Sequence, residues 1–170
     1  MNRHIVLVAF VALMFTLGSR ASAQLVAGSP EDKLYQQIIA AANPADKEKL
    51  CLDFESQFSE SDVVVDIYIM LMEIHGQRND SGKAVEYGEK AITKDPANIS
   101  ALMTVSRTLA VARRLLPKAV SYAERAVAAA AALREKSPPP QYTEEQWMQY
   151  VQATERAARS ILSYARSISG

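Results

Sequence analysis

The chain has 170 residues, of which 49% are apolar and 22% are charged, and its 19 basic residues balance 19 acidic ones. This is the composition of a globular protein, and a chain of this length can bury a core without help from a metal or a disulfide. The even charge argues against nucleic acids and anionic membrane surfaces as partners, because both attract a concentrated basic face.

Residues 1–23 have the three parts of a secretory signal peptide. Arg3 and His4 give a positive start, residues 5–17 form an apolar run, and Ala21-Ser22-Ala23 is a small-x-small cleavage motif. The run is shorter than the ~20 residues of a membrane-spanning helix, so cleavage is preferred to a membrane anchor. Removing this segment leaves 17 basic residues and a net charge of about −2. We expect an exported protein, periplasmic or secreted from a bacterium, without stable membrane insertion.

Residues 24–59 are predicted to form a divergent N-terminal helical hairpin. Ser29 is a suitable N-cap and Pro30 suits the first helical turn. Asn43 and Pro44 end this first helix and begin a second one in the same way.

A ten-residue motif then occurs twice. KAVEYGEKAI at 83–92 and KAVSYAERAV at 118–127 share six identical positions at an offset of 35 residues. An offset of ~20–50 residues is typical of stacked repeat units. One such helix has an apolar stripe that it cannot cover alone, so two copies predict units that bury each other.

Each copy of the motif follows a first helix, predicted at about 63–77 in the first unit and from about 99 in the second. Polar residues separate the two helices of the first unit, and Asn79 among them can adopt a left-handed conformation. The second unit has one extra residue near its turn, where Pro117 begins the helix.

The spacing of five residues in the first unit resembles the tetratricopeptide repeat, a helix–turn–helix unit of ~34 residues. These residues are Tyr68, Leu71, Ala84, Ala91 and Pro96, and Leu102, Ala119 and Ala126 follow the same spacing in the second unit. The two repeats lie at about 63–96 and 99–132, within residues 60–136. The resemblance implies small side chains where paired helices approach closely.

The resemblance has departures. Met72 and Ser106 stand where the family prefers glycine, whereas Gly88 and Ala123 are small where a bulky aromatic residue is usual. We hypothesise that Met72 fills the space that Gly88 leaves.

Residues 137–170 are predicted to form a proline-rich spacer and a long C-terminal helix. Pro138, Pro139 and Pro140 break the preceding helix, and Thr143 and Gln146 form a capping box. The final helix is expected to cap the stack, and the alternative is a truncated third unit. Together these elements predict an all-α fold, a right-handed solenoid of antiparallel helix hairpins with a C-terminal capping helix.

The sequence contains no set of residues that predicts catalysis. After the signal peptide the only histidine is His75, on a packing stripe, and the only cysteine is Cys51, in an apolar stretch. A core histidine and an inert thiol are the preferred interpretations, and a thiol enzyme at Cys51 is a distant alternative. We predict no metal site, no cofactor and no enzyme activity.

The resemblance implies that first helices line a concave surface for a protein or peptide partner. The expected outward positions follow one line of each helix; they are Asp66, Ile69, Glu73 and Gln77, then Ser100, Met103, Arg107 and Val111, with Ala110 as an alternative to Val111. Only Arg107 matches the family's clamp for a C-terminal carboxylate, so that role is not expected. The predicted function is an exported binding scaffold, and the alternative is a self-assembling structural protein of the cell envelope, a homo-oligomer.

Overall fold

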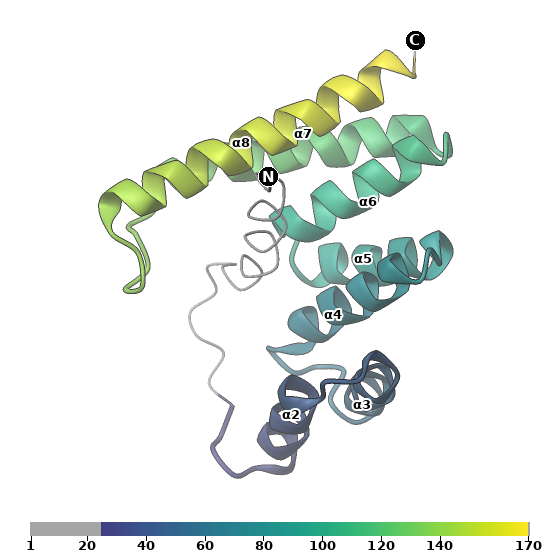
Figure 1. Ribbon diagram of the computed structural model, residues 1–170, viewed down its shortest axis with the longest axis vertical. Helices are drawn as coiled ribbons and strands as arrows, with labels where there is room; N and C mark the ends of the chain where they lie inside the picture. Colours follow the sequence, from purple (N-terminus) through teal and green to yellow (C-terminus); the bar gives the residue numbers. More distant parts are fainter. Residues whose placement is uncertain (1–24, 170) are drawn as a thin grey trace, which may run out of the picture.

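The computed structural model of the chain describes residues 25–169, and the predicted signal peptide lies outside them. This part is all-α, with seven packed α-helices and no strand between residues 25 and 169. Successive helices pack on one another in chain order, from α2 and α3 at one end to α7 and α8 at the other (Figure 1). The helices are α2 (Pro30–Ala40), α3 (Pro44–Gln57), α4 (Val64–Gln77), α5 (Ser81–Lys94), α6 (Ile99–Val111), α7 (Leu116–Ala132) and α8 (Glu144–Ser167), with a short 3-10 helix η1 (Leu133–Glu135) after α7.

Capping residues set most of the helix starts. The Ser29 hydroxyl accepts a hydrogen bond from the Asp32 amide, and Thr143 and Gln146 form the expected capping box. The start of α4 has no side-chain cap. Its N-cap is Val63, whose side chain cannot accept a hydrogen bond, and Ser61 Oγ accepts from the Val63 amide, which lies before the first helical residue.

The two predicted units bury corresponding residues. Along the first helices, five positions of α4 and the positions 34 residues later in α6 are all buried: Ile67, Tyr68, Leu71, Met72 and His75, then Ala101, Leu102, Val105, Ser106 and Leu109. Along the second helices the offset is 35, and the small residues are all buried: Ala84, Gly88 and Ala91, then Ala119, Ala123 and Ala126. The same face of each helix therefore packs inward in both units.

The change of offset from 34 to 35 is located at one residue. Asn79 and Arg113 end the first helices in the left-handed conformation, with φ of 59° and 51°. The next helix then begins after Asp80 in the first unit, but only after Leu115 in the second. Arg114 is therefore the extra residue, and it leaves Leu115 as a left-handed N-cap without a side-chain hydrogen bond.

Gly88 allows a close approach between the units. A Cβ atom at this position would lie 2.3 Å from Cγ2 of Val105 in α6 and 3.0 Å from Sδ of Met72 in α4. Met72 therefore packs against Gly88 as the sequence predicts, but Val105 of the following unit comes nearer still. In the second unit Ser106 replaces methionine, and its hydroxyl donates to the Ala119 carbonyl oxygen at 2.8 Å.

Ion pairs on the surface also join the second helix of each hairpin to the next layer. The pairs are Lys90–Glu55 at 2.9 Å, Lys118–Glu89 at 2.6 Å and Arg166–Glu124 at 2.7 Å, which link α3 to α5, α5 to α7 and α7 to α8. Exposed pairs of this kind contribute at most about 1 kcal/mol each. Apolar packing, rather than these pairs, therefore holds the layers together.

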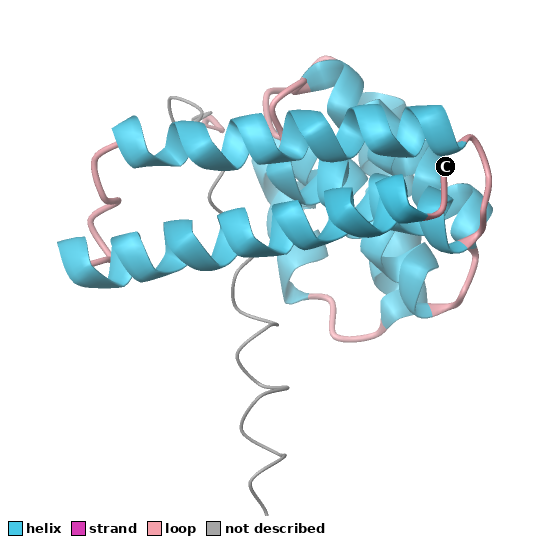
Figure 2. Ribbon diagram, turned by 90° about the horizontal axis from the view of Figure 1, so that it is seen from above, coloured by secondary structure: helices cyan, strands magenta, loops and turns pink. Residues whose placement is uncertain are grey.

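Helices α7 and α8 continue past the other helices at the end where the proline-rich loop joins them (Figure 2). A second, small apolar cluster of Leu133, Trp147 and Val151 lies there, separate from the main core. The Trp147 indole nitrogen donates to the Lys136 carbonyl oxygen at 3.1 Å. Arg134 donates two hydrogen bonds to the Glu155 carboxylate, at 2.5 and 2.9 Å. Among residues 25–169, no helix has both the length and the apolar character needed to cross a membrane.

Candidate functional site

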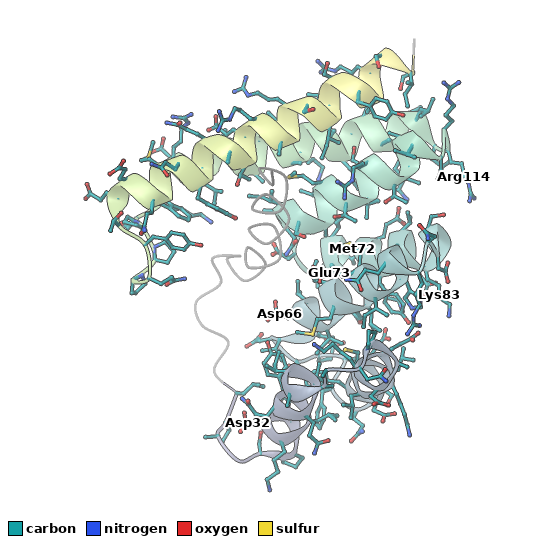
Figure 3. The ribbon with its side chains drawn as sticks, in the orientation of Figure 1. Asp32, Asp66, Met72, Glu73, Lys83 and Arg114 are labelled. Carbon is teal, nitrogen blue, oxygen red and sulfur yellow. The ribbon has the colours of Figure 1, made fainter. Side chains whose placement is uncertain are left out.

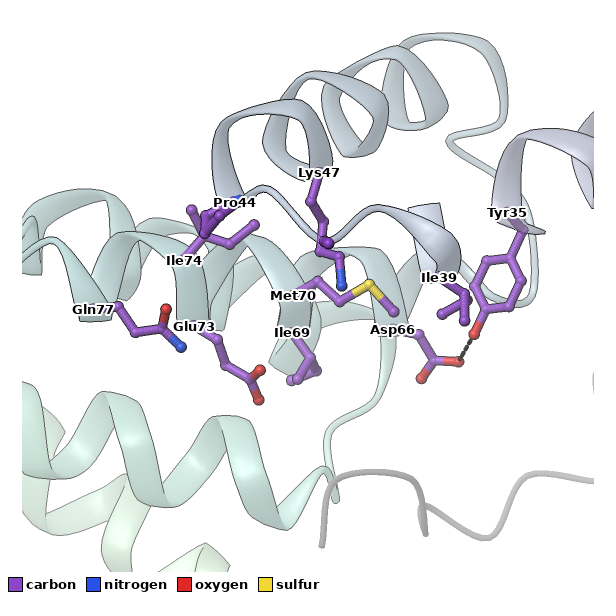
Figure 4. Close-up of a pocket in the computed structure, with 11 residues that line it drawn as sticks. Tyr35, Ile39, Pro44, Lys47, Asp66, Ile69, Met70, Glu73, Ile74 and Gln77 are labelled. Carbon is purple, nitrogen blue, oxygen red and sulfur yellow. Dashed lines mark hydrogen bonds between the residues drawn. The ribbon is translucent and has the colours of Figure 1, made fainter. Parts of the chain in front are cut away.

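A groove of about 330 Å³ lies between the N-terminal hairpin and α4. Helix α4 forms one wall, while α2, the turn after it and the first residues of α3 form the other (Figure 4). Its lining is mixed, with apolar side chains around two carboxylates and one amine. The lining residues are Tyr35, Ile39, Ala42, Pro44, Lys47, Asp66, Ile69, Met70, Glu73, Ile74 and Gln77.

The four α4 residues predicted for the concave face all line this groove. Asp66, Ile69, Glu73 and Gln77 follow one another along the helix because positions three and four residues apart share a face. Their exposure differs, however. Ile69 is only 7% exposed, so it forms the floor of the groove, whereas Asp66 and Gln77 lie at the surface.

The four predicted residues of α6 do not line the groove. Ser100 and Met103 are partly buried, while Arg107 and Val111 are exposed, Val111 at 64%. The Ser100 hydroxyl oxygen is buried and has no hydrogen-bond partner among the described residues. The groove therefore covers half of the predicted binding surface, at the end of the molecule nearest the N-terminal hairpin.

The other wall of the groove is what the sequence did not predict. Tyr35 and Ile39 come from α2 and Lys47 from the first turns of α3. Ile39 is 50% exposed although it belongs to a helix with an apolar stripe. In the sequence, Ile39 lies beside the apolar stripe of this helix and not on it. This position could have indicated a second apolar surface on α2.

Glu73 has the most unusual environment in the groove. Burial raises the pKa of its carboxyl group, and the nearby Lys47 ammonium opposes that shift. Its Oε1 atom is buried, and no hydrogen-bond donor of the described residues reaches it. Figure 3 marks Glu73 and Asp66 on α4. A carboxylate with a buried oxygen and no donor is energetically costly, because a charged acceptor has lost water without gaining a hydrogen bond in return.

A second carboxylate lies at the other end of the groove. The Tyr35 hydroxyl donates to Asp66 Oδ2 at 3.5 Å, the contact drawn in Figure 4. Burial, and then the charge of Asp66, raise the pKa of Tyr35 to about 12, so the phenol stays protonated and can donate. Asp66 and Glu73 thus give this wall of the groove its negative charge.

Cys51 and His75 are both packed in the interior of the protein. Cys51 is fully buried, and desolvation raises its thiol pKa to about 12, which agrees with the inert thiol expected from the sequence. The His75 ring is buried and stacks on Tyr87, with centroids 5.5 Å apart. Its Nε2 lies 3.3 Å from Oε1 of Glu48, so it joins α4 to α3 and α5. Nowhere in residues 25–169 do three or more histidine, cysteine or acidic side chains gather in a way that could hold a metal ion.

Comparison with protein-family models, with curated proteins and with solved structures finds no match to this chain.

Proposed function

We propose that this protein is an exported scaffold of tetratricopeptide-like helical repeats, a right-handed solenoid that binds a partner protein or peptide on its concave face. The observation that carries the proposal is the groove along α4. Its volume is at the low end of the ~300–1,000 Å³ typical of ligand sites. A groove of this size suits a few side chains of a peptide segment rather than a folded domain.

The repeat character is supported by the two units that bury equivalent residues at offsets of 34 and 35. Small residues at Ala84, Ala91, Ala119 and Ala126 are all buried, as the family's close helix contacts require. Export rests on the signal-like residues 1–23 alone. Sequencing the mature N-terminus of a periplasmic or secreted fraction tests it, with Gln24 as the expected first residue.

The self-assembling alternative is less well supported, because most exposed positions of α8 are polar or charged, with Met148 and Tyr164 as apolar exceptions. The polar and charged positions include Gln149, Gln152, Arg156, Arg159 and Ser163. A polar outer face on a terminal helix is what ends a repeat array and keeps it soluble. Light scattering separates the two proposals, since a monomer at all micromolar concentrations contradicts self-assembly.

Ile39→Glu is the sharpest test of the binding proposal. Ile39 is 50% exposed and lines the groove, so a carboxylate there can stay hydrated while it obstructs an apolar segment. Leu52→Glu is the matched control, since Leu52 is 40% exposed on α3 and does not line the groove. Both variants should keep the wild-type circular dichroism and melting temperature.

Each protein is given a photo-crosslinker and exposed to a periplasmic extract. We expect the wild type and Leu52→Glu to crosslink to the same partner and Ile39→Glu to lose it. Crosslinking that is equal in all three proteins, or absent from all three, would contradict binding in this groove.

A further inference from the structure

The chemistry of the groove also indicates what kind of peptide it binds, an inference that rests on the proposed function. Glu73 is central to it. A buried carboxylate oxygen without a donor is satisfied best by an N–H group that carries a positive charge, since hydrogen bonds between charged groups are about twice as strong as neutral ones. The groove lacks such a donor and a ligand can supply it.

Lys47 does not fill this role. Its ammonium group lies close enough to affect the titration of Glu73, but it donates no hydrogen bond that would satisfy Oε1. The groove holds two carboxylates, Asp66 and Glu73, against this one amine, so its net charge is negative. A positively charged ligand would therefore be attracted to the groove, whereas an acidic ligand would be repelled.

The apolar lining around Glu73 indicates which side chains of the ligand should flank its positive charge. Ile69 and Ile74 lie on α4 on either side of Glu73 in the sequence, and Ile39 of α2 lies further along the groove, beside Asp66. Apolar contacts of this kind favour the burial of aliphatic side chains of a ligand. They also shield the carboxylate from water, which strengthens its attraction for a cation.

We propose that the groove binds a peptide segment that directs a lysine or arginine side chain at Glu73 and places aliphatic side chains on either side of it. The long aliphatic stem of such a residue contacts Ile69, and its charged end reaches the Glu73 carboxylate. Asp66 lies further along the groove, and its negative charge repels an acidic residue at that end. The specificity of the groove is therefore for basic, aliphatic segments.

A random dodecapeptide display library, selected on the purified protein, tests this proposal. Peptides are counted as binders when the wild type enriches them and the Ile39→Glu variant does not. We expect these binders to carry lysine or arginine flanked by aliphatic residues. Affinities of synthetic copies are then measured by fluorescence anisotropy on the wild type, on Glu73→Gln and on Glu135→Gln, an exposed control in η1.

In the same peptides the basic residue is also replaced by a neutral one, arginine by citrulline or lysine by glutamine. Glu73→Gln should weaken the basic peptides by about 10-fold to 100-fold, as expected for one charged hydrogen bond. It should leave the neutral peptides unchanged, and Glu135→Gln should change neither set.

Each other result overturns a defined part of the argument. Binders without basic residues, or basic binders that Glu73→Gln leaves unaffected, would refute the proposed specificity but leave a peptide-binding groove in place. A dimer in sedimentation velocity that Ile39→Glu dissociates would show that a second copy occupies the groove, and it would refute the specificity too. If no peptide distinguishes the wild type from Ile39→Glu, the proposed function fails as well.

Discussion

Gly88→Ala is a test of how the two repeat units fit together. Gly88 lies in α5, and the added methyl group would come 2.3 Å from Val105 Cγ2 and 3.0 Å from Met72 Sδ. Methionine can adjust its flexible end, but Val105 is β-branched and fully buried, so it has no other rotamer to adopt without a shift of α6. We expect the substitution to separate α5 from α6.

Two opposing effects decide the magnitude. Alanine in place of glycine favours a helix by about 1 kcal/mol. Overpacking a tightly packed core costs about 1–3 kcal/mol, and a contact as short as 2.3 Å belongs in the upper part of that range. The net result is a loss of roughly 1–2 kcal/mol in the free energy of unfolding, even though the substitution improves the helix propensity of α5.

Urea denaturation followed by circular dichroism measures this loss. Gly76→Ala is the matched control, because Gly76 is an exposed position of α4 where a Cβ atom meets nothing within 4 Å. The control should gain about 0.5–1 kcal/mol, so the two variants should move in opposite directions. Adding Val105→Ala to Gly88→Ala should cost about 1 kcal/mol less than the sum of the single variants, because the methyl groups no longer compete for the same space. A stabilised Gly88→Ala protein, or strictly additive effects, would refute the proposed fit.

Three further predictions follow from local environments. Burial raises the pKa of the Cys51 thiol to about 12 from an ordinary 9, so little reactive thiolate is present at pH 8. Iodoacetamide at this pH should label the folded protein at least about 100-fold more slowly than the unfolded chain. Fast labelling of the folded protein would contradict this prediction. Because burial raises the pKa of Glu73, the folded state binds its proton more tightly than the unfolded chain. Stability should therefore rise as the pH falls through the raised pKa, and the gain is complete below the ordinary carboxyl pKa. Glu73→Gln should remove this part of the pH dependence and raise the melting temperature at pH 7, and an unchanged pH profile would argue against the buried charge. Thr143→Ala should cost about 1 kcal/mol through loss of the capping box, visible in the fluorescence of Trp147, with no loss expected if α8 begins elsewhere.

Local signals in the sequence were sufficient for most helices and for the pairing of helices within a unit. Ser29, Asn43 and Thr143 cap the helices that the sequence predicts, because a capping residue acts through its own neighbours. The start of α4 was predicted to within one residue, although its N-cap, Val63, carries no capping side chain. The extra residue of the second unit was predicted from spacing, and its position is fixed by the left-handed residues on either side of Arg114.

The candidate site was only half predictable. The α4 residues follow from helical periodicity, which places Asp66, Ile69 and Glu73 on one line. The opposite wall depends on how the N-terminal hairpin docks on α4, a contact between segments about 30 residues apart that no short-range pattern specifies. For the same reason the sequence could not show that the α6 residues, Arg107 among them, lie outside the groove.

The projecting end of α7 and α8 has a consequence for how the molecule unfolds. Its small cluster of Leu133, Trp147 and Val151 touches the main core through Ile99, which contacts both. Regions with few such connections open locally at lower free energy than the global transition. Backbone amides near Trp147 should therefore exchange with deuterium sooner than those of α4. Since Trp147 is the only tryptophan of the chain, its emission reports the fraying of this tip and not the melting of the whole molecule.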